Sequence, residues 1–159
     1  MTDSLRTGIG ATEEHALLLM DSYLRWTGRE LVNRESVDDM TSSADVLFRA
    51  PRFILSHGTQ ADPVLNYGNA LALKLWEMDW DKLTSTPSRL TAEPMERAER
   101  DRFFTLVTAN GYVDDYTSIR ISSTGRRFYI KQATVWNVID EAGVYRGQAA
   151  TFTEYSYIE

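Results

Sequence analysis

The chain contains no cysteine among its 159 residues. This absence excludes disulfide bonds, thiolate nucleophiles and cysteine-ligated zinc or iron–sulfur centres. It also excludes any flavin photocycle that depends on a cysteinyl adduct. Histidine is scarce too: His15 and His57 are the only two, so a histidine-rich metal site or a histidine-based triad is hard to assemble. Composition alone therefore argues against thiol-based chemistry and against sites built from several histidines.

The chain also carries fewer positive than negative residues, and it has no long apolar run. Lys and Arg number 17 against 23 Asp and Glu, a net charge of −6. Binding along a nucleic-acid backbone needs a positive field, so we expect no nucleic-acid partner. The longest apolar run, residues 16–20, is far shorter than the ~20 residues of a membrane span, and the N-terminus lacks a signal-peptide pattern. We therefore expect a cytoplasmic protein without a membrane partner.

A helical pattern occupies the first third of the chain. Four apolar residues recur at helical intervals and predict an amphipathic stripe: Leu17, Met20, Leu24 and Leu31. Thr12 is placed to cap the start of this helix, and Gly28 to interrupt or end it. We assign residues 1–50 to an N-terminal helical extension and residues 51–159 to the main domain.

A second clear helix is predicted over Pro94–Asn110, since proline suits a first turn and Asn110-Gly111 closes a last one. Its apolar side is expected to be core and contains Met95, Ala98, Phe103, Leu106 and Val107. Its charges are read as a solvated surface rather than a docking face: Glu93, Glu96, Arg97, Glu99, Arg100, Asp101 and Arg102. Asn69 is placed to cap a further helix.

Strand patterns dominate the rest of the main domain. They cover residues 53–57, 64–65, 116–122, 127–139 and 145–158. The last three are joined by short glycine turns, which predicts an antiparallel meander. The fold class is therefore α+β, with one five-stranded antiparallel sheet and helices packed on one face, plus the N-terminal extension.

Five short segments carry a resemblance to a known family: residues 55–59 (LSHGT), 62–69 (DPVLNYGN), 87–89 (PSR), 125–128 (GRRF) and 147–150 (GQAA). Together they resemble the MEKHLA domain family, a PAS-like family that includes small stand-alone bacterial proteins. The resemblance implies that the strand near residues 53–57 lies centrally beside the last strand. It also implies a sensory role, with an N-terminal flank that covers the outer face of the sheet or builds a dimer.

A PAS-like fold places a ligand pocket between its sheet and its small helices. The predicted lining residues are Tyr67, Trp76, Arg120, Gln132, Trp136 and Gln148. Arg120 can clamp a carboxylate or a phosphate with two hydrogen bonds, or it can face outward and pair with an acid. Gln132 and Gln148 can present amides to a flavin-like ring edge or bond across strands. Trp76 and Trp136 can also be core residues.

Two further positions have open roles. Arg89, in the loop over the expected pocket mouth, can gate the pocket, bind an anion, or pair with Glu93 or Asp81. His57 can be a ligand, a base or a turn residue that bonds the backbone. Haem-binding PAS domains usually ligate through a histidine before the meander, and residues 62–159 contain none, so haem is not expected.

Catalytic motifs are missing from the sequence. It has no glycine-rich phosphate loop, no G-x-S-x-G elbow and no H-E-x-x-H. The leading hypothesis is therefore a PAS-like sensory domain that binds a small molecule or responds to redox state and signals through a partner or dimer. One alternative is an interaction module that binds no ligand and forms a homodimer. The other is a small α+β enzyme that uses His57 or Asp62.

Overall fold

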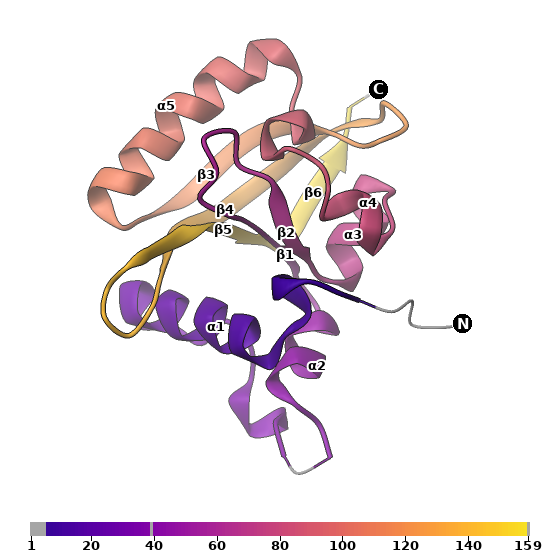
Figure 1. Ribbon diagram of the computed structural model, residues 1–159. Helices are drawn as coiled ribbons and strands as arrows, with labels where there is room; N and C mark the ends of the chain where they lie inside the picture. Colours follow the sequence, from indigo (N-terminus) through magenta and orange to yellow (C-terminus); the bar gives the residue numbers. More distant parts are fainter. Residues whose placement is uncertain (1–5, 39, 159) are drawn as a thin grey trace.

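The computed structural model describes residues 6–38 and 40–158. In these residues an antiparallel sheet lies between helices (Figure 1). The elements in chain order are η1 (Ile9–Ala11), α1 (Glu13–Thr27), η2 (Arg34–Ser36), α2 (Ser43–Phe48), β1 (Phe53–His57), β2 (Leu65–Gly68), α3 (Ala70–Trp76), α4 (Trp80–Leu83), η3 (Ser88–Thr91), α5 (Pro94–Asn110), β3 (Tyr112–Ile121), β4 (Arg127–Ile139), β5 (Tyr145–Phe152) and β6 (Glu154–Tyr157).

The sheet has the strand order β2-β1-β5-β4-β3, and β6 pairs with β4. β1 therefore lies beside the last long strand, as the family resemblance implied. The sheet has six strands rather than five because the expected strand over residues 145–158 is interrupted at Thr153. β4 pairs with β5 along one half of its length and with β6 along the other half.

β4 reverses its side-chain pattern at Gln132. This residue has a φ of 52°, and the pairing of β4 with β3 is irregular around it. An extra residue in a strand moves every later side chain to the opposite face. Ile130 and Ala133 therefore pack in one core, whereas Trp136 packs in the other.

The sheet separates two apolar cores because helices cover both of its faces (Figure 1). The outer core lies beneath α1 and α2 and includes Leu19, Met20, Tyr23, Tyr67, Trp80 and Trp136. The inner core lies beneath α3 and α5 and includes Trp76, Val107, Phe128, Val135 and Phe152. The N-terminal helices thus cover the face that α3 and α5 leave open.

α1 begins and ends where the sequence predicts. Thr12 Oγ1 accepts a hydrogen bond from the backbone N–H of His15 at 3.0 Å. Gly28 ends the helix in the left-handed conformation, with a φ of 74°, which glycine adopts without steric cost.

The buried face of α1 differs from the predicted stripe. Met20 is buried, but Leu17 and Leu24 are each 37% exposed, so the stripe prediction was wrong at those two positions. The helix turns a neighbouring face toward the sheet, where the Tyr23 ring packs edge-on against Trp136 with centroids 4.8 Å apart. An edge-to-face pair of large rings favours this rotation of the helix.

A buried polar contact joins α1 to β1. The His15 ring nitrogen Nε2 lies 3.1 Å from the Ser56 hydroxyl oxygen. Ser56 also donates to Asn66 Oδ1 at 2.5 Å. His15 is 4% exposed and Ser56 2%, so this contact is shielded from water beneath the helix.

α5 has the predicted bounds and closes before Gly111. Its inner side presents Arg100, Phe104 and Val107 at helical spacing, and Arg100 is only 5% exposed. The expectation of a solvated Arg100 was therefore wrong. Leu106, expected in the core, is 54% exposed. Ala98 is exposed, Phe103 is half-buried, and the Met95 side chain lies outside the described residues.

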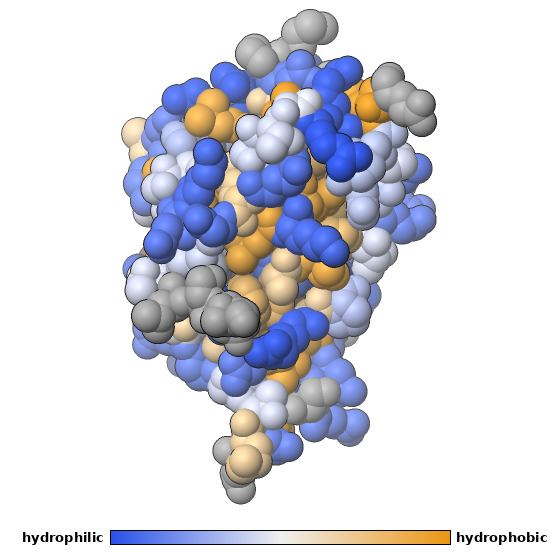
Figure 2. Space-filling view, turned by 90° about the vertical axis from the view of Figure 1, so that its right-hand side faces the viewer, coloured by the Kyte–Doolittle hydropathy of each residue, from blue (hydrophilic) through white to orange (hydrophobic). Residues whose placement is uncertain are grey.

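The molecular surface is not uniformly polar. Figure 2 shows the side on which α3 and α4 lie, where apolar residues gather in a central strip bordered by hydrophilic ones.

Within the described residues, no helix has both the length and the apolarity needed to cross a membrane.

Candidate functional site

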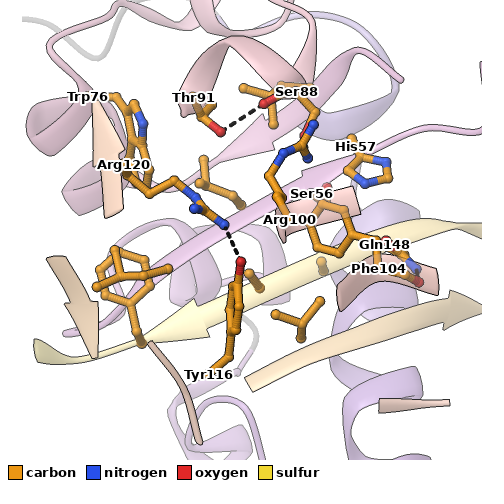
Figure 3. Close-up of a pocket in the computed structure, with 17 residues that line it drawn as sticks. Ser56, His57, Trp76, Ser88, Thr91, Arg100, Phe104, Tyr116, Arg120 and Gln148 are labelled. Carbon is orange, nitrogen blue, oxygen red and sulfur yellow. Dashed lines mark hydrogen bonds between the residues drawn. The ribbon is translucent and has the colours of Figure 1, made fainter. Parts of the chain in front are cut away.

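A pocket lies between the inner face of the sheet and the segment formed by η3 and α5 (Figure 3). Its volume is about 40 Å³. Leu55, Ile130, Val135 and Phe152 make its walls mostly apolar. Its polar lining includes His57, Ser88, Thr91, Arg100, Arg120 and Gln148.

Arg100 enters the pocket from α5. Its Nη1 donates to the Ser88 hydroxyl at 3.3 Å, and its Cζ lies 4.9 Å from the centroid of the Phe104 ring. The nearest carboxylate partner is Asp101 at 3.9 Å, whose side chain is 73% exposed. Burial, followed by repulsion from the charge of Arg120, lowers the pKa of Arg100 to about 10.

Arg120 enters the same pocket from β3. Its Nη2 donates to the Tyr116 hydroxyl at 3.2 Å. Its Nη1 donates to the backbone carbonyl of Ile119 at 2.9 Å and to the Ser118 hydroxyl. Arg120 is 5% exposed, and all of these partners are neutral. Among the residues that the structure describes, Arg120 has no ion pair with an acid on a neighbouring strand, which was one of the two predicted alternatives.

His57 and Gln148 form one end of the pocket because they are paired across β1 and β5. The His57 Nδ1 lies 3.0 Å from the Gly58 carbonyl oxygen. Burial lowers the pKa of His57, and the charge of Arg100 lowers it further. Gln148 donates through Nε2 to Asn137 Oδ1 and to the Thr108 hydroxyl, each at 3.1 Å. The Gln148 amide nitrogen is thus engaged within the protein.

Two residues that line the pocket each carry a buried donor atom with no hydrogen-bond partner among the described residues. These atoms are Nε1 of Trp76 and Nε of Arg100. Neither atom can accept a hydrogen bond. Among the residues that the structure describes, no Asp or Glu lines the pocket, and no group of His, Asp and Glu is arranged to hold a metal ion. The site is electropositive and has spare donors.

Three of the predicted site residues lie in this pocket: Trp76, Arg120 and Gln148. His57, whose role the sequence left open, lies there too. Trp76 is nevertheless also a core residue, because its ring packs against Phe128 with centroids 5.1 Å apart.

Two predicted site residues lie on the opposite face of the sheet. Tyr67 packs in the outer core against Trp80, with ring centroids 5.7 Å apart. Trp136 donates through Nε1 to the Ser22 hydroxyl at 3.1 Å. The sheet therefore separates both rings from the pocket.

Two more predicted site residues lie on the surface. Gln132 is exposed at the irregularity in β4, so its amide does not face the pocket. Arg89 is exposed and pairs with Asp62, Nε to Oδ2, at 3.1 Å. The partner is thus neither Glu93 nor Asp81, the two acids named in one of the predicted alternatives. This ion pair links the η3 loop to the turn before β2.

Sequence reasoning did not select Arg100, Tyr116 or Thr91 as site residues. The available signal for Arg100 was its spacing from Phe103, Phe104 and Val107, which matches one helix face. The surrounding charges obscured that signal. Thr91 and Ser88 come together because Thr91 donates to the Ser88 carbonyl within η3 at 2.8 Å (Figure 3).

An antiparallel sheet with a pocket beneath one long helix and a meander at its end defines a PAS-like α+β domain. More specifically, the chain belongs to the MEKHLA domain family, whose sequence model matches residues 13–157. The resemblance carried by the five segments is thereby confirmed. Among curated proteins, none matches the sequence significantly.

Solved structures share this fold. The PAS domain of a protein from Colwellia psychrerythraea has a TM-score of 0.57 and 12% identity, covering 69% of this chain and 87% of that one. A variant of Vivid has a TM-score of 0.53 and 16% identity, over 65% and 81% of the two chains. A light-oxygen-voltage domain studied with a flavin analogue has a TM-score of 0.53 and 13% identity, over 68% and 77%. At these identities the likeness establishes the fold.

The pocket does not fit a flavin. Pockets for drug-sized ligands occupy roughly 300–1,000 Å³, whereas this pocket has about 40 Å³. Gln132 lies outside it, and the Gln148 amide nitrogen is bonded to Asn137 and Thr108. No flavin chemistry is assigned to these residues.

Proposed function

We propose that this protein is a sensory domain that binds a small molecule in the pocket beneath α5. The observation that carries this proposal is a pocket with mostly apolar walls and a few buried polar residues, among them Arg100, Arg120 and His57. Ligand sites have this composition. Membership of a PAS-like family supports the same role.

Adjacent residues of β1 offer a route by which binding can reach α1. His57 lines the pocket, whereas the Ser56 hydroxyl contacts His15 on the opposite face of the sheet. A ligand that shifts β1 would change how α1 packs. We propose that a partner, or a second copy of the chain, reads this change.

We propose no catalytic role for His57. Nucleophilic catalysis needs a hydroxyl or thiol within hydrogen-bond reach of a base. The nearby Ser56 hydroxyl bonds Asn66 and faces His15 instead. His15 and Ser56 do lie within reach of each other, but both are buried between α1 and the sheet.

Native mass spectrometry of the purified full chain tests the sensory proposal. We expect a small bound molecule, or a rise in the unfolding midpoint with one or more compounds of a metabolite set. Ala150→Leu should abolish either signal because Ala150 lines the pocket. Ala150→Val is the milder alternative, and Ala109→Leu, on the exposed side of α5, is the control. The proposal would be refuted if no molecule is found bound and no compound of the set raises the unfolding midpoint.

A further inference from the structure

Two buried arginines face one pocket, and none of the described residues that line it is acidic. We propose that the pocket binds a small oxyanion, a carboxylate or a phosphate, held between Arg100 and Arg120. This inference rests on the proposed sensory function and names its class of ligand. It extends the alternative that the sequence left open for Arg120 and adds Arg100, which the sequence did not select.

The first step is charge. Burying a charge is costly unless an opposite charge and hydrogen bonds accompany it. Arg100 and Arg120 are each 5% exposed, and their hydrogen-bond partners in the pocket are hydroxyls and a backbone carbonyl. The only ion pair of either residue in the described chain is the 3.9 Å contact of Arg100 with exposed Asp101. An anion in the pocket would supply the missing negative charge.

The second step is hydrogen bonding, which is independent of charge. Buried polar groups in folded proteins nearly always have a partner. On the residues that line this pocket, the unpartnered atoms are Nε of Arg100 and Nε1 of Trp76, and both only donate. The missing partner is therefore an acceptor. A carboxylate or phosphate offers several acceptor oxygens to the two guanidinium groups at once.

The third step is size. A buried water needs on the order of 10–15 Å³ of such space, so a pocket of about 40 Å³ suits a compact group rather than an extended molecule. Figure 3 shows the Arg120 guanidinium in the middle of the labelled side chains, with Arg100 beside it and the Ser88–Thr91 turn nearby.

Titration calorimetry and thermal unfolding of the full chain test this inference. The probes are acetate, malonate and inorganic phosphate, with chloride at matched ionic strength as the salt control. We expect at least one oxyanion to bind and to raise the unfolding midpoint when chloride does not. Comparing acetate and malonate with inorganic phosphate shows whether the pocket prefers a carboxylate or a phosphate.

Substitutions assign the binding to the two arginines. Arg100→Met and Arg120→Met should each weaken binding by roughly 10- to 100-fold, the value of a charged hydrogen-bond partner. Arg100→Lys and Arg120→Lys keep the positive charge but lose the planar guanidinium that can donate two parallel hydrogen bonds. These variants should therefore bind the oxyanion more weakly than the wild-type protein but more tightly than the Met variants. Arg102→Met, exposed on the same helix as Arg100, should leave the affinity unchanged.

A purely structural role for Arg100 predicts a different pattern. The variant Arg100→Met would then unfold at lower temperature in anion-free buffer, and wild type would show no oxyanion response. We expect instead an unfolding midpoint at least equal to that of wild type without anion, because an unpaired buried charge has been removed. Neutral compounds that bind equally to wild type and both Met variants would overturn this inference and leave the sensory proposal intact. The absence of any pocket ligand would overturn both.

Discussion

The His15 ring lies 3.1 Å from the Ser56 hydroxyl through Nε2, and this contact connects α1 to β1. Burial lowers the pKa of His15 from its ordinary 6.5 to about 4. At neutral pH the imidazole that contacts the sheet is therefore uncharged. Protonation of that imidazole is opposed in the folded state and free in the unfolded state.

The first prediction is a loss of stability in mild acid. Above pH 6.5 the contribution of His15 is fully present, because the ring is neutral in both states. As the pH falls from 6.5 toward 4, the unfolded chain takes up a proton at His15 that the folded chain does not. The contribution of His15 to the free energy of unfolding therefore falls by about 3 kcal/mol. Urea unfolding at pH 8, 6.5, 5 and 4 measures this dependence.

The comparison variant for this prediction is His15→Gln, which retains a donor for Ser56. It should be less stable than wild type at pH 8 but should depend less on pH between 6.5 and 4. His57 has a lowered pKa as well and titrates in both proteins, so its effect cancels in the difference. Equal slopes in the two proteins would contradict the assignment to His15.

The second prediction concerns whether α1 is part of the cooperative fold. Leu19 is fully buried in the outer core, whereas Leu17, two residues earlier, is 37% exposed. Leu19→Ala should lower the free energy of unfolding by about 2–5 kcal/mol, and Leu17→Ala by about 0.5 kcal/mol or less. Chemical denaturation followed by tryptophan fluorescence measures both. Similar small effects would show instead that residues 1–50 form a separable extension.

The third prediction uses the positive φ of Gln132, which is 52°. A β-branched residue is strained in this conformation, although it suits an ordinary strand. Gln132→Val should destabilise the protein by about 1–2 kcal/mol. Lys131→Val, at the neighbouring exposed position, should be nearly neutral. The opposite order of the two variants in urea unfolding would argue against the irregularity in β4.

Features that depend on local chemistry could be predicted from the sequence. Asn69 was expected to cap a helix, and its Oδ1 accepts from the backbone N–H of Ala72 at 3.3 Å. Gly28 was expected to interrupt or end α1, and it ends that helix. The meander followed from alternation and glycine turns. In each case a few neighbouring residues determine the structure.

Features that depend on tertiary packing could not be predicted in this way. No glycine in the sequence marks the irregularity at Gln132. This irregularity nevertheless decides which face of the sheet each later side chain of β4 occupies, so that Trp136 lies in the outer core and Val135 lines the pocket. The burial of Arg100 depends on which face of α5 meets the sheet, and its charged neighbours concealed that face. Arg120 lines the pocket, but the sequence could not show that its partners are the Tyr116 and Ser118 hydroxyls and the Ile119 carbonyl.

The last prediction links His57 to the two arginines. The charge of Arg100 is one cause of the lowered pKa of His57, so Arg100→Met should raise that pKa. A bound oxyanion should raise it too, because it offsets the same positive charge. Titration of the His57 ring Cε1–H signal by NMR measures the pKa, and His57→Gln assigns the signal. Arg102→Met should leave it unchanged. If Arg100→Met left the pKa of His57 where it was, the two side chains would not share one electrostatic environment, and His57 could not report pocket occupancy.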